Sequence, residues 1–282
     1  MNNRFWPGLA ALGVAAAALA APASATDYHG TFALQGGTPR IVMHLATTPG
    51  KTAEDATLDL WATTTASSSP LASFETVHTK KMHLIAVSDD LGVFLHEHPT
   101  LLSNGHFTLT LHVPRAALYH IFADVTPHGL SQQVVRFDVP FGSGARTPVM
   151  VTVPKRTVDA GPYAVTLSTL RLGAGDMAML SADVEKNGKP ATDLHPYLGA
   201  AAHAVFIHYA DWTYVHVHPI ATSGGNERNG MGSTEASLSP GAKVSPSMML
   251  HVMVTEPGNY KLWLEFRGGA DLYRAPFVLT AS

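Results

Sequence analysis

The sequence predicts an all-β protein made of two tandem antiparallel β-sandwich repeats, immunoglobulin-like or cupredoxin-like, after a cleaved signal peptide. Beyond the N-terminal 25 residues, no segment keeps a helical apolar period over three turns. Short segments rich in β-branched residues alternate instead with Gly, Pro and Ser clusters, which is typical of antiparallel sandwiches. A closed barrel is the alternative. The clearest predicted strands cover residues 40–45, 57–63, 106–113, 163–167 and 248–254.

Residues 1–25 have the three parts of a signal peptide. Arg4 is the only charge before an apolar run at 9–21, and small residues at Ala23 and Ala25 mark a cleavage point. The run of about 13 residues is too short to cross a hydrocarbon core of roughly 30 Å. We therefore expect a periplasmic or secreted protein without stable membrane insertion.

The composition excludes several classes of protein. The chain has 282 residues, of which 46% are hydrophobic and 14% charged, so it can bury a substantial core. A formal charge of −3 gives no basic footprint for nucleic acid. The absence of cysteine excludes disulfides, thiolate zinc sites and iron–sulfur clusters, whereas histidine is abundant, with 16 residues.

An internal repeat organises the histidines. With an offset of 120 residues, a His, a spacer of twelve residues and a His-x-His-Pro motif occur twice. This divides the mature chain into repeats at 26–146 and 147–282. Further along, the offset becomes 141 and aligns Asp124 with Glu265, so the second repeat carries about 21 extra residues. These lie in a loop at 222–247, which is either a plain surface loop or a lid carrying Met231.

Each histidine motif fits a β-hairpin. A tight turn at Asp90-Leu91 would place His83 opposite His98 and Ile85 opposite His96. Residues two apart on a strand share a face, so three imidazoles converge on one patch. The second repeat gives the same register. The six candidate metal ligands are His83, His96, His98, His203, His216 and His218.

Three neutral imidazoles form a good site for Cu(II), Zn(II) or Ni(II). We expect one three-histidine site per repeat, with copper as the ion and zinc or nickel as alternatives. A fourth ligand could be water, a methionine or a group from the other repeat. Two other interpretations stay open: histidines that only pack across strands, and a pH-sensitive interface between the repeats.

Some other residues give weaker signals. Asp124 and Glu265 could accept an imidazole N–H or could be solvated acids at strand ends. His78 has no counterpart in the second repeat, where Leu198 aligns with it. Methionines also gather around His251 and on a separate strand, where they either favour Cu(I) or fill the core. These are Met177, Met179, Met248, Met249 and Met253.

The motifs resemble a family. The segment Lys81-Met82-His83-Leu84-Ile85-Ala86-Val87-Ser88-Asp89-Asp90-Leu91, with Phe94-x-His96-x-His98-Pro99, resembles bacterial secreted proteins with two such hairpin repeats. Pro196-Tyr197-Leu198-Gly199-Ala200-x-x-His203, with His216-Val217-His218-Pro219, resembles their partner repeat. The resemblance implies periplasmic copper or heavy-metal handling and no particular reaction.

The sequence favours metal binding over catalysis. Copper–zinc superoxide dismutase and multicopper oxidases need cysteines that are absent, and a cupin needs a glutamate where Leu101, Leu102 and Ser103 stand. No catalytic residue is assigned. We expect copper buffering, delivery or resistance, with a periplasmic metal transporter or chaperone as partner. The alternatives are a metal-dependent redox enzyme reacting with superoxide or oxygen, and a metal-free structural or adhesion module.

Overall fold

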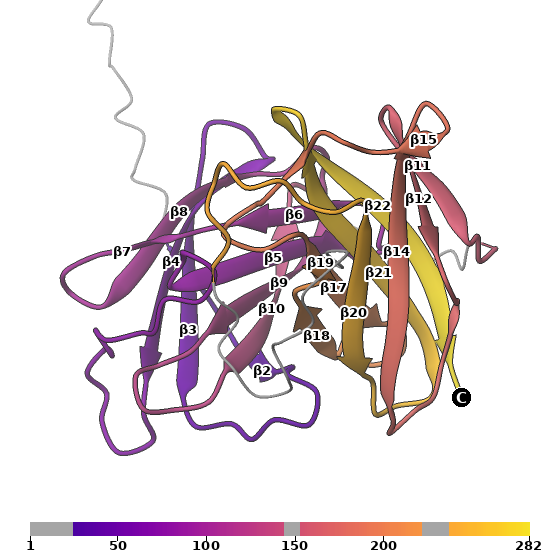
Figure 1. Cartoon of the computed structure of the whole chain (residues 1–282). Coiled ribbons are helices and arrows are strands. Elements are labelled where there is room, and N and C mark those ends of the chain that lie inside the picture. The colour runs from indigo at the N-terminus through magenta and orange to yellow at the C-terminus, as the bar shows by residue number, and fades with distance from the viewer. Residues whose placement is uncertain (1–24, 144–152, 222–236) are drawn as a thin grey trace, which may run out of the picture.

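The computed structural model describes residues 25–143, 153–221 and 237–282. The predicted all-β class is confirmed, because these residues form strands and turns and contain no helix (Figure 1). Accordingly, no helix in the described part of the chain is long and apolar enough to span a membrane. Most of the predicted signal peptide, the expected boundary between repeats and Met231 lie outside the described residues.

The first half is a sandwich of two five-stranded sheets, in the orders β1-β3-β4-β8-β7 and β2-β10-β9-β5-β6. The strands of the first, outer sheet are β1 (Thr26–Tyr28), β3 (Val42–Pro49), β4 (Asp55–Thr63), β8 (His106–His112) and β7 (Thr100–Leu101). Those of the second, inner sheet are β2 (Thr31–Phe32), β10 (Gln133–Phe141), β9 (Ala117–Val125), β5 (Met82–Ser88) and β6 (Phe94–Glu97).

The second half repeats this arrangement, with an outer sheet β11-β12-β14-β20-β19 and an inner sheet β13-β22-β21-β17-β18. All pairs are antiparallel except β13 with β22. The outer strands are β11 (Thr157–Ala160), β12 (Tyr163–Leu167), β14 (Met177–Lys186), β20 (Ser247–Met253), β19 (Ile220–Ala221) and β15 (Lys189–Pro190), which pairs with β14. The inner strands are β13 (Arg171–Leu172), β22 (Asp271–Ala281), β21 (Gly258–Gly268), β17 (His203–His208), β18 (Tyr214–Val217) and β16 (Leu194–His195), which pairs with β21.

Each half has a core of its own between its two sheets. In β4, burial alternates along the strand, with Leu58 and Leu60 fully buried and their neighbours Thr57 and Asp59 facing outward. Leu180 and Ala182 take the same role in β14. This period of two is what an antiparallel sheet with one covered face requires.

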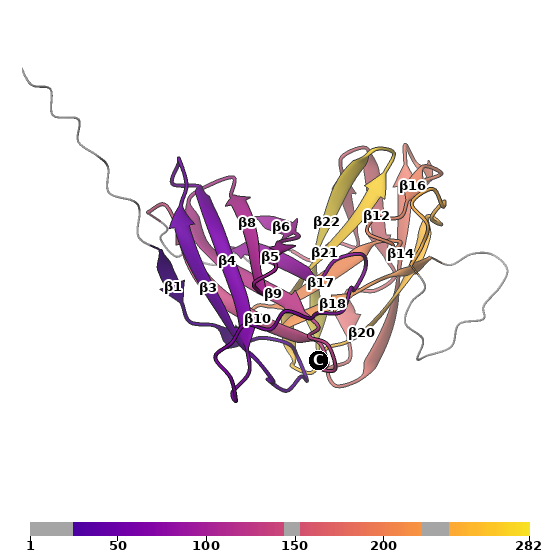
Figure 2. The ribbon, with the colours of Figure 1, turned by 90° about the vertical axis from the view of Figure 1, so that its left-hand side faces the viewer.

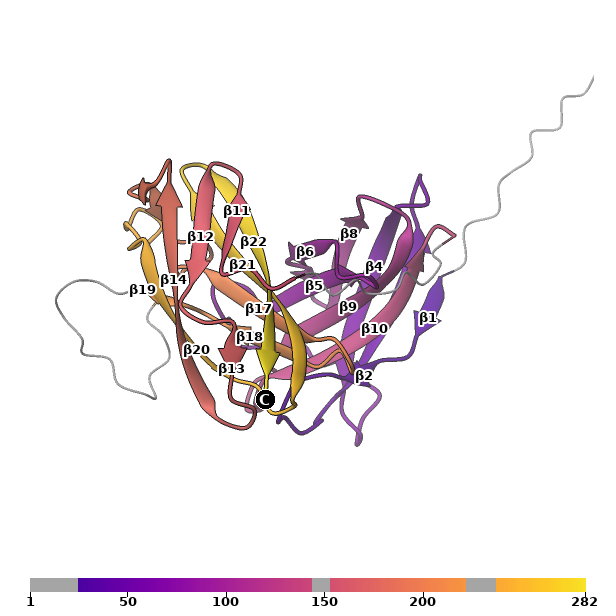
Figure 3. The ribbon, with the colours of Figure 1, turned by 90° about the vertical axis from the view of Figure 1, so that its right-hand side faces the viewer.

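A third core joins the halves. Figures 2 and 3 show that β5 and β9 face β17 and β21 across the middle of the molecule, so both inner sheets are covered on both faces. This explains why every residue of β5 and of β17 is buried. The apolar side chains between the inner sheets are Ala33, Ile85, Val87, Leu91, Phe94, Phe122, Val134, Val205, Ile207, Tyr214 and Trp263.

The contacts between the halves are reciprocal. Phe94 stacks on Trp263 with ring centroids 4.9 Å apart, and Tyr214 stacks on Phe122 at 5.3 Å. Phe94 and Tyr214 are equivalent in the repeat, as are Phe122 and Trp263. The same pair of positions therefore meets twice, each time with one member from each half. Two bodies in such reciprocal contact are related by a two-fold axis, here an approximate one.

One segment of the first half departs from this symmetry and crosses to the second. The backbone N–H of Tyr214 donates to the carbonyl of Ala33 at 2.9 Å, and the N–H of Gln35 donates to the carbonyl of Tyr214 at 3.3 Å. Nearby, Arg136 Nη1 donates to the carbonyl of Asp211 at 3.1 Å. These hydrogen bonds tie β18 to the first half.

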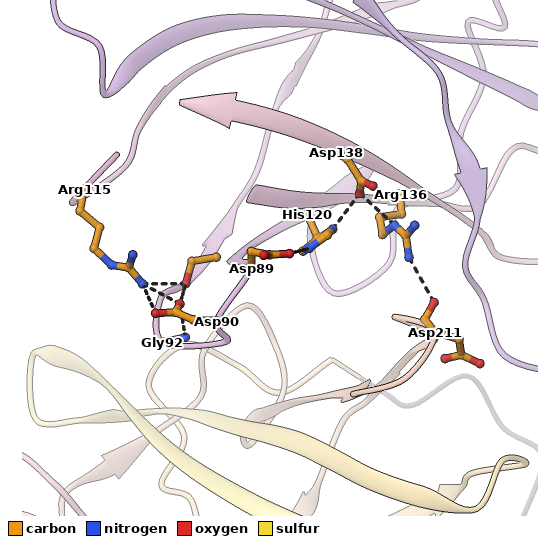
Figure 4. Close-up of polar contacts among 9 residues, drawn as sticks. Asp89, Asp90, Gly92, Arg115, His120, Arg136, Asp138 and Asp211 are labelled. Atoms are coloured by element: carbon orange, nitrogen blue, oxygen red, sulfur yellow. Dashed lines mark hydrogen bonds and ion pairs between the residues drawn. The ribbon is translucent and has the colours of Figure 1, made fainter. Parts of the chain in front are cut away.

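Side-chain hydrogen bonds hold the turn between β5 and β6 (Figure 4). Asp90 Oδ1 accepts from the backbone N–H of Gly92 at 3.0 Å and from Arg115 Nη2 at 2.6 Å. Leu91 takes a positive φ of 55° there. The turn predicted at Asp90-Leu91 therefore has a defined conformation that fixes the register of the two strands.

His120 supports the same hairpin from β9 and does not join the metal candidates. Its Nε2 lies 2.9 Å from Asp89 Oδ1 and its Nδ1 2.7 Å from Asp138 Oδ1 (Figure 4). Its ring also stacks on Trp212 of the second half at 3.7 Å. Both ring nitrogens are thus committed, so the role of His120 is structural.

The last part of the predicted loop 222–247 packs against the second half. The backbone N–H of Leu238 donates to the carbonyl of Gly199 at 2.8 Å, and that of Val244 donates to the carbonyl of Leu194 at 3.1 Å. Val244 is buried. Residues 237–247 are therefore part of the fold of the second half.

Candidate metal centre

Both histidine hairpins have the predicted register. Ile85 pairs with His96 in the first half, and Val205 pairs with His216 in the second. The same register, extended by one step of two residues, sets His83 against His98, whose ring centroids lie 5.1 Å apart. The imidazoles of each trio lie on the face of the sheet that points toward the other half.

The two expected three-histidine clusters are not separate from each other. The inner sheets face each other, so the two trios meet at the approximate two-fold axis and form a single cluster. His83 lies 5.9 Å from His203 and His96 lies 5.2 Å from His203, measured between ring centroids. One group of rings close enough to hold an ion even combines the halves: His83, His96 and His203. The second group is the trio predicted for the second repeat, His203, His216 and His218.

Four of the rings lie at the corners of a nearly regular tetrahedron. The centroids of His83, His96, His203 and His216 are 5.2–5.9 Å apart in all six pairings. An ion bound at about 2.0–2.1 Å by one nitrogen from each ring would hold the centroids about 3.2 Å away and about 5.2 Å from one another. The observed ring spacing is close to this value, and the nitrogens already close enough to share an ion form two groups that have His203 in common.

Two of these rings are held by backbone carbonyls. His83 Nε2 lies 3.0 Å from the carbonyl oxygen of Val77, and His203 Nε2 lies 3.1 Å from that of Tyr197. A carbonyl oxygen only accepts hydrogen bonds, so in both rings Nε2 carries the hydrogen. The lone pair is therefore on Nδ1, which points into the cluster.

The other two rings are held by carboxylates of the opposite half. His96 Nδ1 lies 2.9 Å from Glu265 Oε2, and His216 Nδ1 lies 3.4 Å from Asp124 Oδ2. Both acids are buried, at 1% and 6% exposure, so neither is a solvated strand-end acid. In metal-binding histidines, the ring nitrogen that does not bind the ion usually donates its N–H to such a carboxylate.

Within each half, two nitrogens that can bind a metal ion face each other. His83 Nδ1 and His96 Nε2 are 3.0 Å apart, and His203 Nδ1 and His216 Nε2 are 3.3 Å apart. The other nitrogen of each ring donates elsewhere, so two lone pairs would oppose each other unless a proton or a cation lies between them. Neighbouring nitrogens of a tetrahedral ion are about 3.3–3.4 Å apart at these bond lengths, so the pair in the second half has this spacing and the pair in the first half is slightly closer.

Further histidines flank the four central rings. His98 lies 4.7 Å from His96, and His218 lies 4.6 Å from His216, between centroids. The Nε2 atoms of His98 and His218 are buried without a hydrogen-bond partner among the described residues. Such atoms are costly to leave unsatisfied, and they can serve as additional ligands.

Sequence reasoning missed His78. Its ring lies 3.5 Å from that of His218 and 5.8 Å from that of His203, so it belongs to the cluster. His78 sits at positive φ in a tight turn between Val77 and Lys80. Because Leu198 occupies the equivalent turn, the repeat gives no signal for it.

Burial keeps five of the clustered rings neutral. It lowers the pKa of His83 to about 4 and that of His98 to about 2, with a further contribution from the neighbouring His96. For the same reason the pKa values of His203, His216 and His218 lie far below the ordinary value. Neutral imidazoles are the form that binds metal ions.

These depressed pKa values predict an acid-labile metal-free protein. The unfolded chain takes up protons near pH 6.5 and folded His83 only near pH 4, so the free energy of unfolding falls as pH drops between those values. One such ring lowers the free energy of unfolding by about 2 kcal/mol at pH 5, compared with neutral pH. Urea unfolding should show a lower midpoint at pH 5 than at pH 7.5, by less in His83→Gln. Equal midpoints would contradict neutral buried rings.

A small hollow opens onto the cluster. It has a volume of about 220 Å³, and His83, His216 and His218 contribute to its wall together with Asp124. Burial raises the pKa of Asp124, whereas hydrogen bonds from Gln132 stabilise its ionised form. The hollow gives a route by which an ion can reach ligands that are otherwise buried.

The chain matches one protein family. The family, described as a domain of unknown function (DUF8832), matches residues 41–141 and 156–282, which together make up most of the sequence. The chain belongs to this family. No protein of curated function matches it.

Proposed function

We propose that this member of the DUF8832 family binds a copper ion between its two halves, in an export compartment, for copper buffering or delivery. The observation that carries the proposal is the tetrahedron of His83, His96, His203 and His216. Three features support it: the second nitrogen of each ring is held in place, the other nitrogens face one another within each half, and burial keeps His83, His203 and His216 neutral.

The donor set favours a late transition metal. All candidate ligands are imidazoles, and the nearby carboxylates are engaged with ring N–H groups instead of facing the centre. Imidazole suits copper, zinc and nickel, whereas magnesium and calcium prefer oxygen. A tetrahedral arrangement fits the d¹⁰ ions Cu(I) and Zn(II) better than Cu(II) or Ni(II), which prefer square geometries.

Two buried carboxylates add a preference for cations. Glu265 and Asp124 lie directly behind the imidazoles, and Arg274 Nε, 2.8 Å from Glu265 Oε1, compensates only one of them. Burial raises the pKa of Asp124, and an ion at the centre would favour its ionised form in this region of low dielectric. The flanking rings His98 and His218 complete the set of six candidate ligands.

The proposal is tested by metal titration of the mature chain, purified without a histidine tag. Cu(I), Cu(II), Zn(II) and Ni(II) are each added in competition with a chromophoric chelator. We expect one tight equivalent per chain that depends on the clustered histidines, and copper retained there when Cu(I) and Zn(II) compete at equal concentration. Retention of Zn(II) would assign the site to zinc, and absence of any tight equivalent would refute metal binding.

The export compartment and the partner rest on the sequence. The N-terminal segment 1–25 supports export, and a periplasmic metal transporter or chaperone is the corresponding partner. N-terminal sequencing of the protein from a periplasmic extract tests the first point. A chain beginning near Thr26 is expected, and one that retains Met1 in the cytoplasm would refute export.

A further inference from the structure

The outer face of the second sandwich carries an unusual group of methionines. β14 and β20 pair so that Met177 lies opposite Met253 and Met179 lies opposite His251. Met177, Met179 and Met253 are 63%, 64% and 46% exposed, and His251 is exposed as well. Two strands that looked unrelated in the sequence thus bring three thioethers and an imidazole to one solvent-facing patch.

Core filling does not explain these residues. Leu180, Met248, Leu250 and Val252 alternate with them along the strands and fill the core of the second half. The exposed methionines lie on the opposite face, where an apolar side chain gains nothing from burial. Met248 shows the contrast directly: it is fully buried, next to Met249 on the outer face.

The duplicated fold shows that this face does not require methionine. Leu101 and Ala221 are equivalent in the repeat. Leu101 pairs with Phe107 of β8, and Ala221 pairs with Met248 of β20, so Phe107 and Met248 are equivalent and β8 aligns with β20. The residues equivalent to Met177, Met179, His251 and Met253 are then Asp55, Thr57, Thr110 and His112. The first half thus carries ordinary polar residues at the same positions.

We propose that Met177, Met179, Met253 and His251 form a second metal site, which binds Cu(I) at the surface. Opposed residues in a sheet have Cβ atoms about 4.5–5.5 Å apart, and diagonal neighbours remain within reach of long side chains. Methionine has three rotatable side-chain bonds, so the sulfur atoms can converge on one ion. Thioethers are soft ligands that select Cu(I).

This site is separate from the histidine cluster. The cluster lies on the face of the inner sheet that points toward the other half, whereas the methionines lie on the outer face of the outer sheet, with the core of the second half between them. Figure 3 shows β14 and β20 on the flank of the molecule, away from β5 and β9. Solvent reaches the outer ligands directly, which suits capture of an ion from a carrier.

The test compares copper binding in matched variants of the full mature chain. Cu(I) is titrated under anaerobic conditions against a chromophoric chelator, and X-ray absorption reports sulfur around the bound copper. The triple variant Met177→Leu, Met179→Leu, Met253→Leu keeps the apolar surface and removes the sulfur atoms. We expect it to lose one Cu(I) equivalent and the sulfur signal while it keeps the nitrogen-bound equivalent.

Two controls make the outcome specific. Met248→Leu, which changes a core-facing methionine of the same strand, should keep both equivalents. His96→Ala should lose the nitrogen-bound equivalent and keep the sulfur signal, so failure of either site is visible separately. If the wild-type protein shows no sulfur around copper, or if the triple variant binds as much Cu(I), the methionine site is refuted, and an apolar docking surface would then explain the exposed residues.

Discussion

His96→Ala and His216→Ala, one in each half, are each expected to abolish the same tight metal equivalent. Each ring is one corner of the central tetrahedron, with its centroid 5.2–5.6 Å from the other three. Removal of a residue that only orients a ligand costs about 10–100-fold in affinity, so loss of a ligand should cost more than about 100-fold. Competition titration with a chelator measures the change.

The control for this pair is His128→Ala. His128 is an exposed histidine with Nδ1 close to Glu75, outside the cluster, and its replacement should leave the affinity unchanged. If each half instead held its own ion, either cluster variant would keep one intact site of wild-type affinity. That result would restore the arrangement of separate sites that the sequence alone suggested.

Glu265→Gln is expected to weaken metal binding by about 10–100-fold. Glu265 Oε2 receives the Nδ1–H of His96 from across the interface, which directs Nε2 of that ring into the cluster. The glutamine side chain can turn its NH₂ group toward His96, where it cannot accept the ring N–H. The substitution also removes a negative charge close to the ion. The measurement is the dissociation constant at fixed pH and salt, with circular dichroism to confirm folding.

A matched control lies nearby. Glu256→Gln removes a negative charge from an exposed position of the same half and should leave the affinity unchanged. Asp124→Asn, the equivalent change in the first half, should resemble Glu265→Gln because Asp124 supports His216 in the reciprocal position. Unaltered affinity in both interface variants would show that the carboxylates do not support metal ligands.

The local geometry was predictable from the sequence. The hairpin register followed from the turn at Asp90-Leu91 and from a strand period of two, and it is present in both halves. The outer strands were also found, because one of their faces is solvated and their apolar residues alternate. β12 (Tyr163–Leu167) has the predicted bounds.

The packing of one half on the other was not predictable. Nothing in a single repeat shows that its sheet face, with Ile85 and Val87, will be covered by the equivalent face of the next repeat. That contact moves the two trios into one cluster and buries Asp124 and Glu265, which the sequence could only align. The methionine face was hidden for a different reason: Met179 and His251 are 72 residues apart in the chain and meet only through the pairing of β14 with β20 within the second half.

The most direct test of a shared metal centre is anomalous diffraction from crystals of the metal-loaded chain, recorded at the absorption edge of the bound ion. We predict a peak at the approximate two-fold axis, within bonding distance of His83, His96, His203 and His216. Two peaks at the interface, each bound only by histidines of one half, would contradict the shared centre, as would the absence of any peak among these rings.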